Sequence, residues 1–201
     1  MIKNVIFDLG QVLYRFEPLE LSGEYTEDES VSRLLSEVVF DRLYWDRLDL
    51  GTIEDEELIE LACERLPQEL HALARKTYYN CFHNMPKVPG MQDVITRVKK
   101  AGRRVFLLSN ISKHFSRHSA DFDLLSEFEF CVFSADIGMV KPSREIFEYI
   151  LNKAGINAEE TLFIDDSEKN LRGAELLGIH TYLFDGNAEK LSEYLEKEIK
   201  E

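Results

Sequence analysis

Residues 3–13 read Lys-Asn-Val-Ile-Phe-Asp-Leu-Gly-Gln-Val-Leu, and the rest of the chain can be interpreted outward from them. Their β-branched and aromatic side chains predict a short strand that is buried on both faces. Asp8 comes where this strand ends, and Gly10 follows two residues later. An isolated Asp-x-Gly sequence is typical of a turn. In a parallel sheet, however, ligands bind at the carboxyl ends of the strands, so Asp8 is also the first candidate for chemistry.

Net charge limits the classes of partner. The chain has 201 residues, enough to bury a core, with 38 acidic and 24 basic side chains and a formal net charge of -14. Such a surface repels nucleic acid and anionic membranes, so we expect neither as a partner. A phosphate-bearing ligand would need a local cation or a metal ion to be admitted. No extended apolar stripe is left unassigned in the sequence, and we therefore expect a monomer.

The cysteines point to a reducing compartment. Cys63, Cys81 and Cys131 are odd in number and widely spaced, without partners at metal-binding intervals. This usage is typical of reduced thiols in an intracellular protein. The sequence also has no signal-peptide or transmembrane pattern, so we expect a cytoplasmic location.

Residues 16–85 have a helical pattern. Apolar residues recur there at helical spacing and predict a bundle of about four helices. Expected breaks lie at Gly23, at residues 49–52 and at Leu66-Pro67, where glycine, proline and short polar residues interrupt the pattern. The acidic run at residues 54–57 suits the first turn of a helix, which carries the positive end of the helix dipole.

From residue 86 onward, strands alternate with helices. Together with the strand that ends at Asp8, this alternation predicts a doubly wound α/β fold with a parallel, Rossmann-like sheet. We therefore divide the chain into an α/β core of residues 1–15 and 86–201 and an inserted helical cap of residues 16–85. The insertion follows the first strand, so we expect it to cover Asp8 as a lid. The later strands are expected at residues 104–109, 130–133, 161–165 and 179–183.

Polar residues follow four of the expected strands. In addition to Asp8, these residues are Ser109-Asn110, Lys141-Pro142 and Asp165-Asp166. Each pair has an ordinary explanation when it is considered alone. Ser109 or Asn110 could cap a helix, Lys141 could be a solvated lysine before a proline-initiated helix, and Asp166 with Ser167 could cap the next helix.

Their expected meeting at one edge of the sheet favours a reactive site. Two carboxylates about 4 Å apart repel by roughly 4 kcal/mol at an effective dielectric near 20, so Asp8, Asp165 and Asp166 need compensating positive charge. Lys141 supplies one charge, and an oxygen-seeking ion such as Mg2+ suits carboxylates without His or Cys. Ser109 can donate a hydrogen bond to a phosphate oxygen, with amide N–H groups beside it. A carboxylate nucleophile, a magnesium ion, a lysine and a hydroxyl donor together indicate phosphoryl transfer.

At this point the sequence resembles a known family. The segments Phe7-Asp-Leu-Gly-Gln-Val-Leu13, Leu107-Leu-Ser-Asn110, Gly138-Met-Val-Lys-Pro142 and Phe163-Ile-Asp-Asp-Ser167 are similar to the four successive motifs of the haloacid dehalogenase superfamily. The resemblance covers the whole chain. The cap position is similar to that of the phosphatase-rich branch, and the Asp-Leu-Gly sequence is similar to that of bacterial phosphatases of glucose 1-phosphate.

The resemblance implies a role for each motif. Asp8 would attack phosphorus and form an aspartyl-phosphate. Ser109 and the Asn110 backbone would hold phosphate oxygens, while Lys141 would neutralise Asp8 and the transferring group. Asp166 would bind magnesium together with Asp8 and the backbone carbonyl of Gly10, with Asp165 contributing directly or through water. The expected substrate is a small phosphorylated metabolite, most simply a sugar phosphate.

Gly10 departs from the family pattern. Most phosphatases of the family have at this place an aspartate that protonates the leaving group and later activates water. General acid–base catalysis contributes about 10²- to 10⁴-fold, so its loss would slow turnover without abolishing it. A leaving group that needs little protonation, or an acid lent by the cap, could compensate. The candidates in the cap and its hinge are Arg15, Trp45, Asp46, Arg47 and Asp49.

Other functions stay open from the sequence. A 2-haloacid dehalogenase shares the aspartate, serine and lysine without needing a metal, although the pair Asp165-Asp166 would burden the binding of an anionic haloacid. A phosphomutase would need the proton shuttle that Gly10 removes. A non-catalytic phosphate-binding protein would also tolerate Gly10, but such a protein has no reason to keep mutually repelling carboxylates.

Overall fold

Five parallel strands form one sheet in the order β3-β2-β1-β4-β5. The computed structural model describes residues 1–83 and 85–199. The strands are β1 (Asn4–Phe7), β2 (Arg104–Ser109), β3 (Cys131–Phe133), β4 (Thr161–Asp165) and β5 (His180–Leu183). Phe7 of the central strand pairs with Leu107 of β2 and with Ile164 of β4. This register brings the carboxyl ends of β1, β2 and β4 side by side. The α/β prediction is confirmed.

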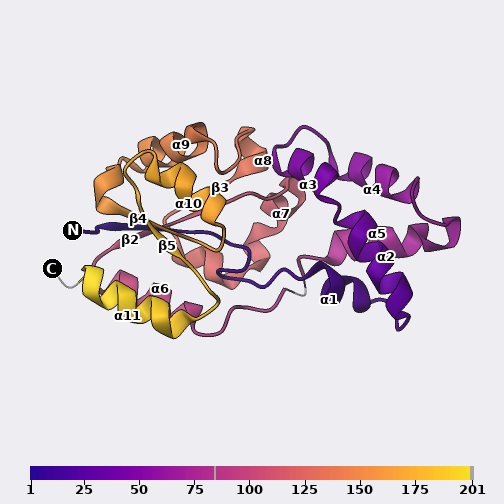
Figure 1. Ribbon diagram of the computed structural model, residues 1–201, viewed down its shortest axis with the longest axis horizontal. Helices are drawn as coiled ribbons and strands as arrows, with labels where there is room; N and C mark the ends of the chain where they lie inside the picture. The colour runs from indigo at the N-terminus through magenta and orange to yellow at the C-terminus, as the bar shows by residue number, and fades with distance from the viewer. Residues whose placement is uncertain (84, 200–201) are drawn as a thin grey trace.

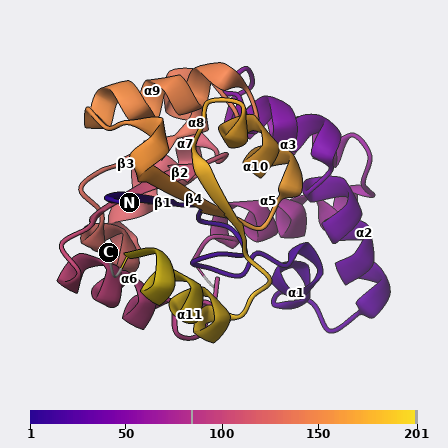
Figure 2. The same ribbon diagram turned by 60° about the vertical axis from the view of Figure 1, so that its left-hand side comes forward.

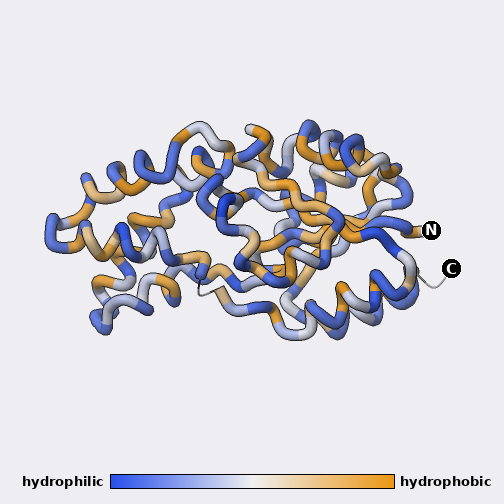
Figure 3. The backbone as a smooth tube through the Cα atoms, turned by 180° about the vertical axis from the view of Figure 1, so that it is seen from behind, coloured by the Kyte–Doolittle hydropathy of each residue, from blue (hydrophilic) through white to orange (hydrophobic). Residues whose placement is uncertain are grey.

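Alternate residues of the strands face two separate helical layers (Figures 1 and 2). One layer is α9 (Arg144–Ala154) and α10 (Glu168–Glu175), and it packs against Ile6, Phe106 and Phe163. The other contains α6 (Met91–Lys100), α7 (Lys113–His118) and α11 (Ala188–Ile199), and its core includes Val5 and Leu107. Figure 3 shows hydrophobic residues along the central strands. Burial of both faces explains why β1 is apolar from Val5 to Phe7.

The helical segment lies beyond the carboxyl ends of the strands (Figure 1). It holds five α-helices in the described residues: α1 (Pro18–Gly23), α2 (Glu29–Val39), α3 (Arg42–Asp49), α4 (Asp55–Cys63) and α5 (His71–Asn80). The expected number was about four. The additional break falls at Asp41, whose carboxylate accepts a hydrogen bond from the Leu43 N–H and so starts α3.

Two neighbouring chain segments connect the helical segment to the sheet. The Arg15 N–H donates to the Pro86 carbonyl at 2.8 Å, and the Val88 N–H donates to the Leu13 carbonyl at 2.9 Å. The division of the chain at residues 15/16 and 85/86 stays a prediction. No helix in the described part of the chain has the length and hydrophobicity to cross a membrane.

Candidate active site

The backbone turns sharply after β1. Gln11 adopts a left-handed conformation with φ 57°, and the Leu13 and Tyr14 N–H groups both donate to the Leu9 carbonyl. Gly10 does not have a positive φ, and a Cβ placed on it would meet no atom within 4 Å. The turn therefore does not require glycine at position 10. Steric space for a side chain exists there, so the missing carboxylate is not a consequence of crowding.

Asp8, Lys141 and Asp165 form a buried ionic triad. Lys141 Nζ lies 2.7 Å from Asp8 Oδ1 and 2.7 Å from Asp165 Oδ2, and its side chain is 1% exposed. The interpretation of Lys141 as a solvated lysine is therefore wrong. Burial disfavours the ammonium, yet the carboxylates of Asp165 and Asp8 raise the pKa of Lys141 above its usual value. The lysine stays charged between its two partners.

Asp165 and Asp166 are adjacent in sequence but differ in surroundings. The Asp165 carboxylate also accepts a hydrogen bond from the Ser167 N–H at 2.8 Å and two from Asn170 Nδ2 at 3.1 Å. Asp166 is exposed and lines the pocket next to Asp8. Its carboxylate accepts no hydrogen bond from any described side chain. Asp165 is thus a buried anchor, and Asp166 presents its oxygens to the pocket.

The three carboxylates are arranged as cation ligands. One oxygen from each of Asp8, Asp165 and Asp166 can be chosen so that all lie within 4.8 Å of one another. Lys141 neutralises only one of these three negative charges. Burial raises the pKa of Asp8, which Lys141 opposes and Asp165 reinforces, and burial with the Asp165 charge also raises the pKa of Asp166. An oxygen-only, electron-rich cluster of this kind suits a hard divalent cation.

Ser109 and Asn110 occupy the next strand end. Ser109 is 3% exposed, and the contact of its hydroxyl with the Asn110 carbonyl, at 3.5 Å, is at the limit of a hydrogen bond. The Asn110 amide donates to the Lys141 carbonyl at 2.9 Å and accepts from the Lys141 N–H at 2.8 Å. Ser112, not Ser109 or Asn110, caps α7. The helix-cap interpretation is therefore wrong, and the Asn110 side chain holds the segment that carries Lys141.

These groups open into a pocket of about 190 Å³. The core provides the polar floor, which consists of Asp8, Ser109, Asn110 and Asp166. The walls are mostly apolar and come mainly from the helical segment and its hinge; they include Phe16, Trp45, Phe82, Met85 and Ile111. The ring centroids of Phe16 and Trp45 lie 5.4 Å apart, and those of Phe16 and Phe82 lie 6.3 Å apart. These aromatic contacts stabilise the walls.

The cap candidates from the sequence separate into two groups. Trp45 and Asp49 line the pocket. Arg15, Asp46 and Arg47 are not among its lining residues; they form surface ion pairs with Glu20, Arg42 and Glu57 respectively. The sequence analysis missed Phe16, Arg42, Phe82 and Met85 as pocket residues. No sequence signal marks them, because their shared surface arises only when the two connecting segments and α3 meet.

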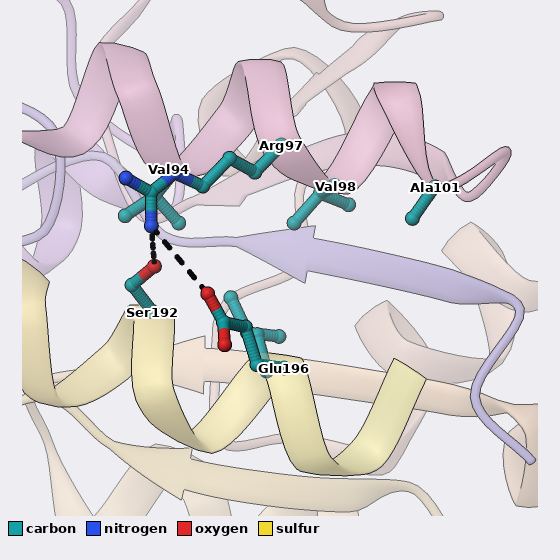
Figure 4. A pocket seen from close by; sticks show the side chains of 7 residues that line it. Val94, Arg97, Val98, Ala101, Ser192 and Glu196 are labelled. Atoms are coloured by element: carbon teal, nitrogen blue, oxygen red, sulfur yellow. Dashed lines mark hydrogen bonds and ion pairs between the residues drawn. The ribbon is translucent and has the colours of Figure 1, made fainter. Parts of the chain in front are cut away.

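A second hollow of about 190 Å³ lies between α6 and α11, away from these groups (Figure 4). Its floor is mainly Val94, Val98 and Leu195, and Arg97 donates to Ser192 Oγ at 2.7 Å. Arg97 also pairs with Glu196 at 3.7 Å. This hollow lacks a group of convergent carboxylates, so the pocket at β1 is the candidate active site.

Comparison with protein families shows the family of the chain. A model of haloacid dehalogenase-like hydrolases matches residues 2–178, which include all four polar strand ends. The matched range also contains the whole helical segment.

Characterised relatives share much of the chain. A sesquiterpene phosphatase of Aspergillus oryzae, astK, is 28% identical over 187 residues, covering 88% of this chain and 87% of the relative. A D-ribitol-5-phosphate phosphatase of Bacteroides thetaiotaomicron is 24% identical over 199 residues, covering 90% of this chain and 91% of the relative.

A solved structure has the same fold. It is a haloacid dehalogenase-family enzyme of Bacteroides thetaiotaomicron in complex with magnesium and inorganic phosphate, with a TM-score of 0.72 and 23% identity. The similarity covers 95% of this chain and 99% of that chain.

Proposed function

The chain belongs to the haloacid dehalogenase-like hydrolases, and within this family we propose that it is a magnesium-dependent phosphatase of small phosphorylated metabolites. The observation that carries the proposal is the position of Lys141 Nζ, which lies 2.7 Å from both Asp8 and Asp165. Lys141 and the Leu9 N–H both bind Asp8 Oδ1, so Oδ2 of the same carboxylate accepts no hydrogen bond from described residues. That oxygen is available as a nucleophile at the floor of the pocket.

Asp8 is the proposed nucleophile. Its free oxygen would attack phosphorus, forming a bond to phosphorus while the bond to the leaving oxygen breaks. Lys141 keeps the attacking carboxylate ionised and offsets charge on the phosphoryl group. Ser109 and Asn110 line the same floor, and we propose that the Ser109 hydroxyl and the Asn110 backbone N–H donate hydrogen bonds to phosphate oxygens.

The proposed metal ligands are Asp8, Asp166 and the backbone carbonyl of Gly10, all of which line the pocket. Bound there, Mg2+ would neutralise the excess carboxylate charge and attract the anionic phosphate. Asp165 already accepts hydrogen bonds from Lys141, Ser167 and Asn170, so we assign it the role of positioning Lys141. Asp166 is the direct ligand of the two adjacent aspartates.

A sugar phosphate is the proposed substrate class. The pocket volume of about 190 Å³ is below the range of about 300–1,000 Å³ that suits drug-sized ligands. A small polyol or sugar ring fits this size and can pack its C–H face against Trp45 or Phe16. Two relatives acting on ribitol 5-phosphate and on phosphorylated carbohydrates support the same class.

The apolar walls favour a second candidate substrate. Six apolar residues line the pocket, with Leu9 in addition to those of its walls, and the Aspergillus oryzae relative is a sesquiterpene phosphatase. A phosphorylated isoprenoid would bury its chain against these walls, but a long chain would have to extend out of the cavity. Dehalogenation is disfavoured because the exposed carboxylate of Asp166 would repel an anionic haloacid.

Phosphate release tests these assignments. We would assay the purified chain with sugar phosphates, an aryl phosphate, a prenyl phosphate and 2-chloropropionate, with Mg2+ or with a chelator. We expect phosphate release that stops with the chelator and returns with added Mg2+. Asp8→Asn should lower kcat by at least about 10⁴-fold.

Asp93→Asn, on the exposed side of α6, is the matched control and should keep full activity. Metal-independent chloride release would instead establish a dehalogenase. Failure of every phosphate substrate, or full activity in Asp8→Asn, would contradict the phosphatase assignment.

A further inference from the structure

The proposed phosphatase lacks an evident proton donor at the floor of its pocket. A sugar alkoxide that departs from phosphorus is a strong base, so cleavage of the phosphate ester benefits from a general acid that protonates the leaving oxygen. Asp8 is the nucleophile, Asp166 faces the metal position, and Asp165 is held by Lys141. Gly10 has no side chain. The acid must therefore come from another wall of the pocket.

Among the described residues, Asp49 is the one remaining carboxylate that lines the pocket. It is the last residue of α3, it belongs to the helical cap, and it is 6% exposed. Within the described residues its carboxyl accepts no hydrogen bond and forms no ion pair. A buried carboxylate without a partner is costly, because burial removes water without replacing its hydrogen bonds. A protonated carboxyl, which can donate one hydrogen bond, fits this environment better.

The backbone of Asp49 is hydrogen-bonded, through Ser134, to the segment that follows Ser109 and Asn110. Ser134 Oγ donates to the Asp49 carbonyl at 2.6 Å and accepts from the Ile111 N–H at 2.9 Å. Ile111 directly follows Ser109 and Asn110, so a single hydroxyl connects the backbone of Asp49 to the floor of the pocket. Gly51 strengthens this contact, since a Cβ at that position would lie 2.5 Å from the Ala135 carbonyl oxygen. Only glycine permits so close an approach of cap and core.

We propose that Asp49 is the general acid and base of this active site, and that it replaces the side chain absent at Gly10. This inference rests on the proposed phosphatase function and names the group that the leaving alcohol must contact. Its substrates are accordingly phosphate esters with basic leaving groups, such as those of alcohols and sugars.

Each proton has a defined source and destination. As Asp8 attacks phosphorus, the bond to the leaving oxygen breaks and the Asp49 carboxyl transfers its proton to that oxygen. The resulting Asp49 carboxylate then takes a proton from water, whose oxygen attacks the phosphorus of the aspartyl-phosphate. Inorganic phosphate leaves, and Asp8 is restored as a carboxylate and Asp49 as an acid.

The charges around Asp49 suit this cycle. Burial raises the pKa of Asp49 to about 7, with Asp46 adding to the rise and Arg42 and Lys141 opposing it. A pKa near neutrality lets one group serve first as acid and then as base. The other ionised groups that line the same pocket are Arg42 of the cap and Asp8 and Asp166 of the core.

The test compares two leaving groups in Asp49→Asn. The parameter kcat/KM reports the steps up to departure of the leaving group, so a lost acid affects basic leaving groups selectively. We expect kcat/KM to fall about 10²-fold or more for a sugar phosphate. For 4-nitrophenyl phosphate, whose leaving group needs no proton, the fall should be within about 5-fold. An equal fall for both substrates would overturn the proposal.

Three further variants make the result specific. Asp41→Asn, at the start of α3, keeps a good helix cap outside the pocket and should leave both substrates unaffected. Asp49→Glu should recover part of the lost activity on the sugar phosphate. Gly10→Asp, for which the structure has space, should restore sugar-phosphate turnover in the Asp49→Asn background. Failure of both Asp49→Glu and Gly10→Asp to restore any turnover would count against the proposal.

A trapped intermediate separates this proposal from the phosphatase assignment itself. With 4-nitrophenyl phosphate, Asp49→Asn should accumulate phosphorylated Asp8, which intact-protein mass spectrometry detects. Wild-type protein without any phosphatase activity would contradict the proposed function. An active wild type with a substrate-independent effect of Asp49→Asn would contradict only the role of Asp49.

Discussion

The core and the cap each bury an aspartate near the same pocket, and the two are surrounded very differently. Asp165 of the core is 0% exposed and is held by Lys141, Asn170 and the Ser167 N–H. Asp49 of the cap is 6% exposed, and its carboxyl has no hydrogen-bond partner among the described residues. Asp165 and Asp49 are thus similarly buried, but within the described part of the chain only the Asp165 carboxylate has charged and hydrogen-bonding partners.

This difference teaches how one residue type can serve two purposes. Charged and hydrogen-bonded partners stabilise an ionised carboxylate, whereas desolvation without partners favours the protonated form. In the core, the first arrangement fixes Lys141 beside Asp8, the proposed nucleophile. In the cap, the Asp49 carboxyl is desolvated without partners among the described residues, and the proposal that it acts as an acid follows from this arrangement. The comparison predicts that substitutions in the two regions will affect stability with opposite signs.

Removal of Lys141 should have the largest effect. Lys141→Met leaves Asp8 and Asp165 buried without their counter-charge, and breaking a buried ion pair typically costs about 3–5 kcal/mol. We expect urea denaturation at pH 7 to show a loss of this size, with phosphatase activity falling to background. Lys190→Met, which breaks only an exposed pair with Asp185, should change stability little. Similar effects of both variants would mean that the buried triad does not stabilise the core.

Asp49→Asn should stabilise the protein at alkaline pH. The folded pKa of about 7 lies above the reference value of 3.8, so stability is fully present below the reference value and is lost as pH rises through 7. The neutral amide avoids this loss, and the gain at pH 8 is up to about 4 kcal/mol. Thermal unfolding at pH 4 and pH 8 would measure the difference.

The matched control for that measurement is Asp41→Asn. Hydrogen bonds from the Leu43 N–H and from Arg65 lower the pKa of Asp41, so its carboxylate stabilises the fold above the reference pKa. Replacing it should therefore reduce stability at pH 8 instead of raising it. If Asp49→Asn behaves in the same way as Asp41→Asn, Asp49 is ionised in the folded protein and the contrast with Asp165 disappears.

The smallest expected effect concerns the link between the two regions. Ser134→Ala removes the hydrogen bond to the Asp49 carbonyl and leaves the Ile111 N–H without an acceptor, which typically costs about 1–3 kcal/mol. Because the backbone of Asp49 loses its anchor to the core, turnover of a sugar phosphate should fall more than that of 4-nitrophenyl phosphate. Ser126→Ala, whose hydroxyl donates to the exposed Asp123 carbonyl, is the control and should not separate the substrates. Parallel changes in both substrates would show that this hydroxyl does not position Asp49.

The sequence by itself determined the core of this protein and the residue types of its site. Short apolar runs predict strands because both faces of a parallel sheet are buried, and polar residues after such runs meet at one edge. The pattern alone therefore places Asp8, Ser109, Lys141 and Asp165 near neighbouring strand ends. It likewise identifies Gly10 as the position without a side chain.

Only the tertiary structure decided which of the acidic residues are held by buried partners and which line the pocket. Asp165 and Asp166 are equivalent in sequence, yet one is buried against Lys141 and the other faces the pocket. Among the cap candidates, Asp46 forms a surface ion pair and Asp49 lines the cavity, although the two lie within one turn of the same helix. The reason is physical. An apolar run shows directly which residues of a buried strand are covered, whereas the side of a cap helix that faces the pocket depends on packing between segments far apart in the chain.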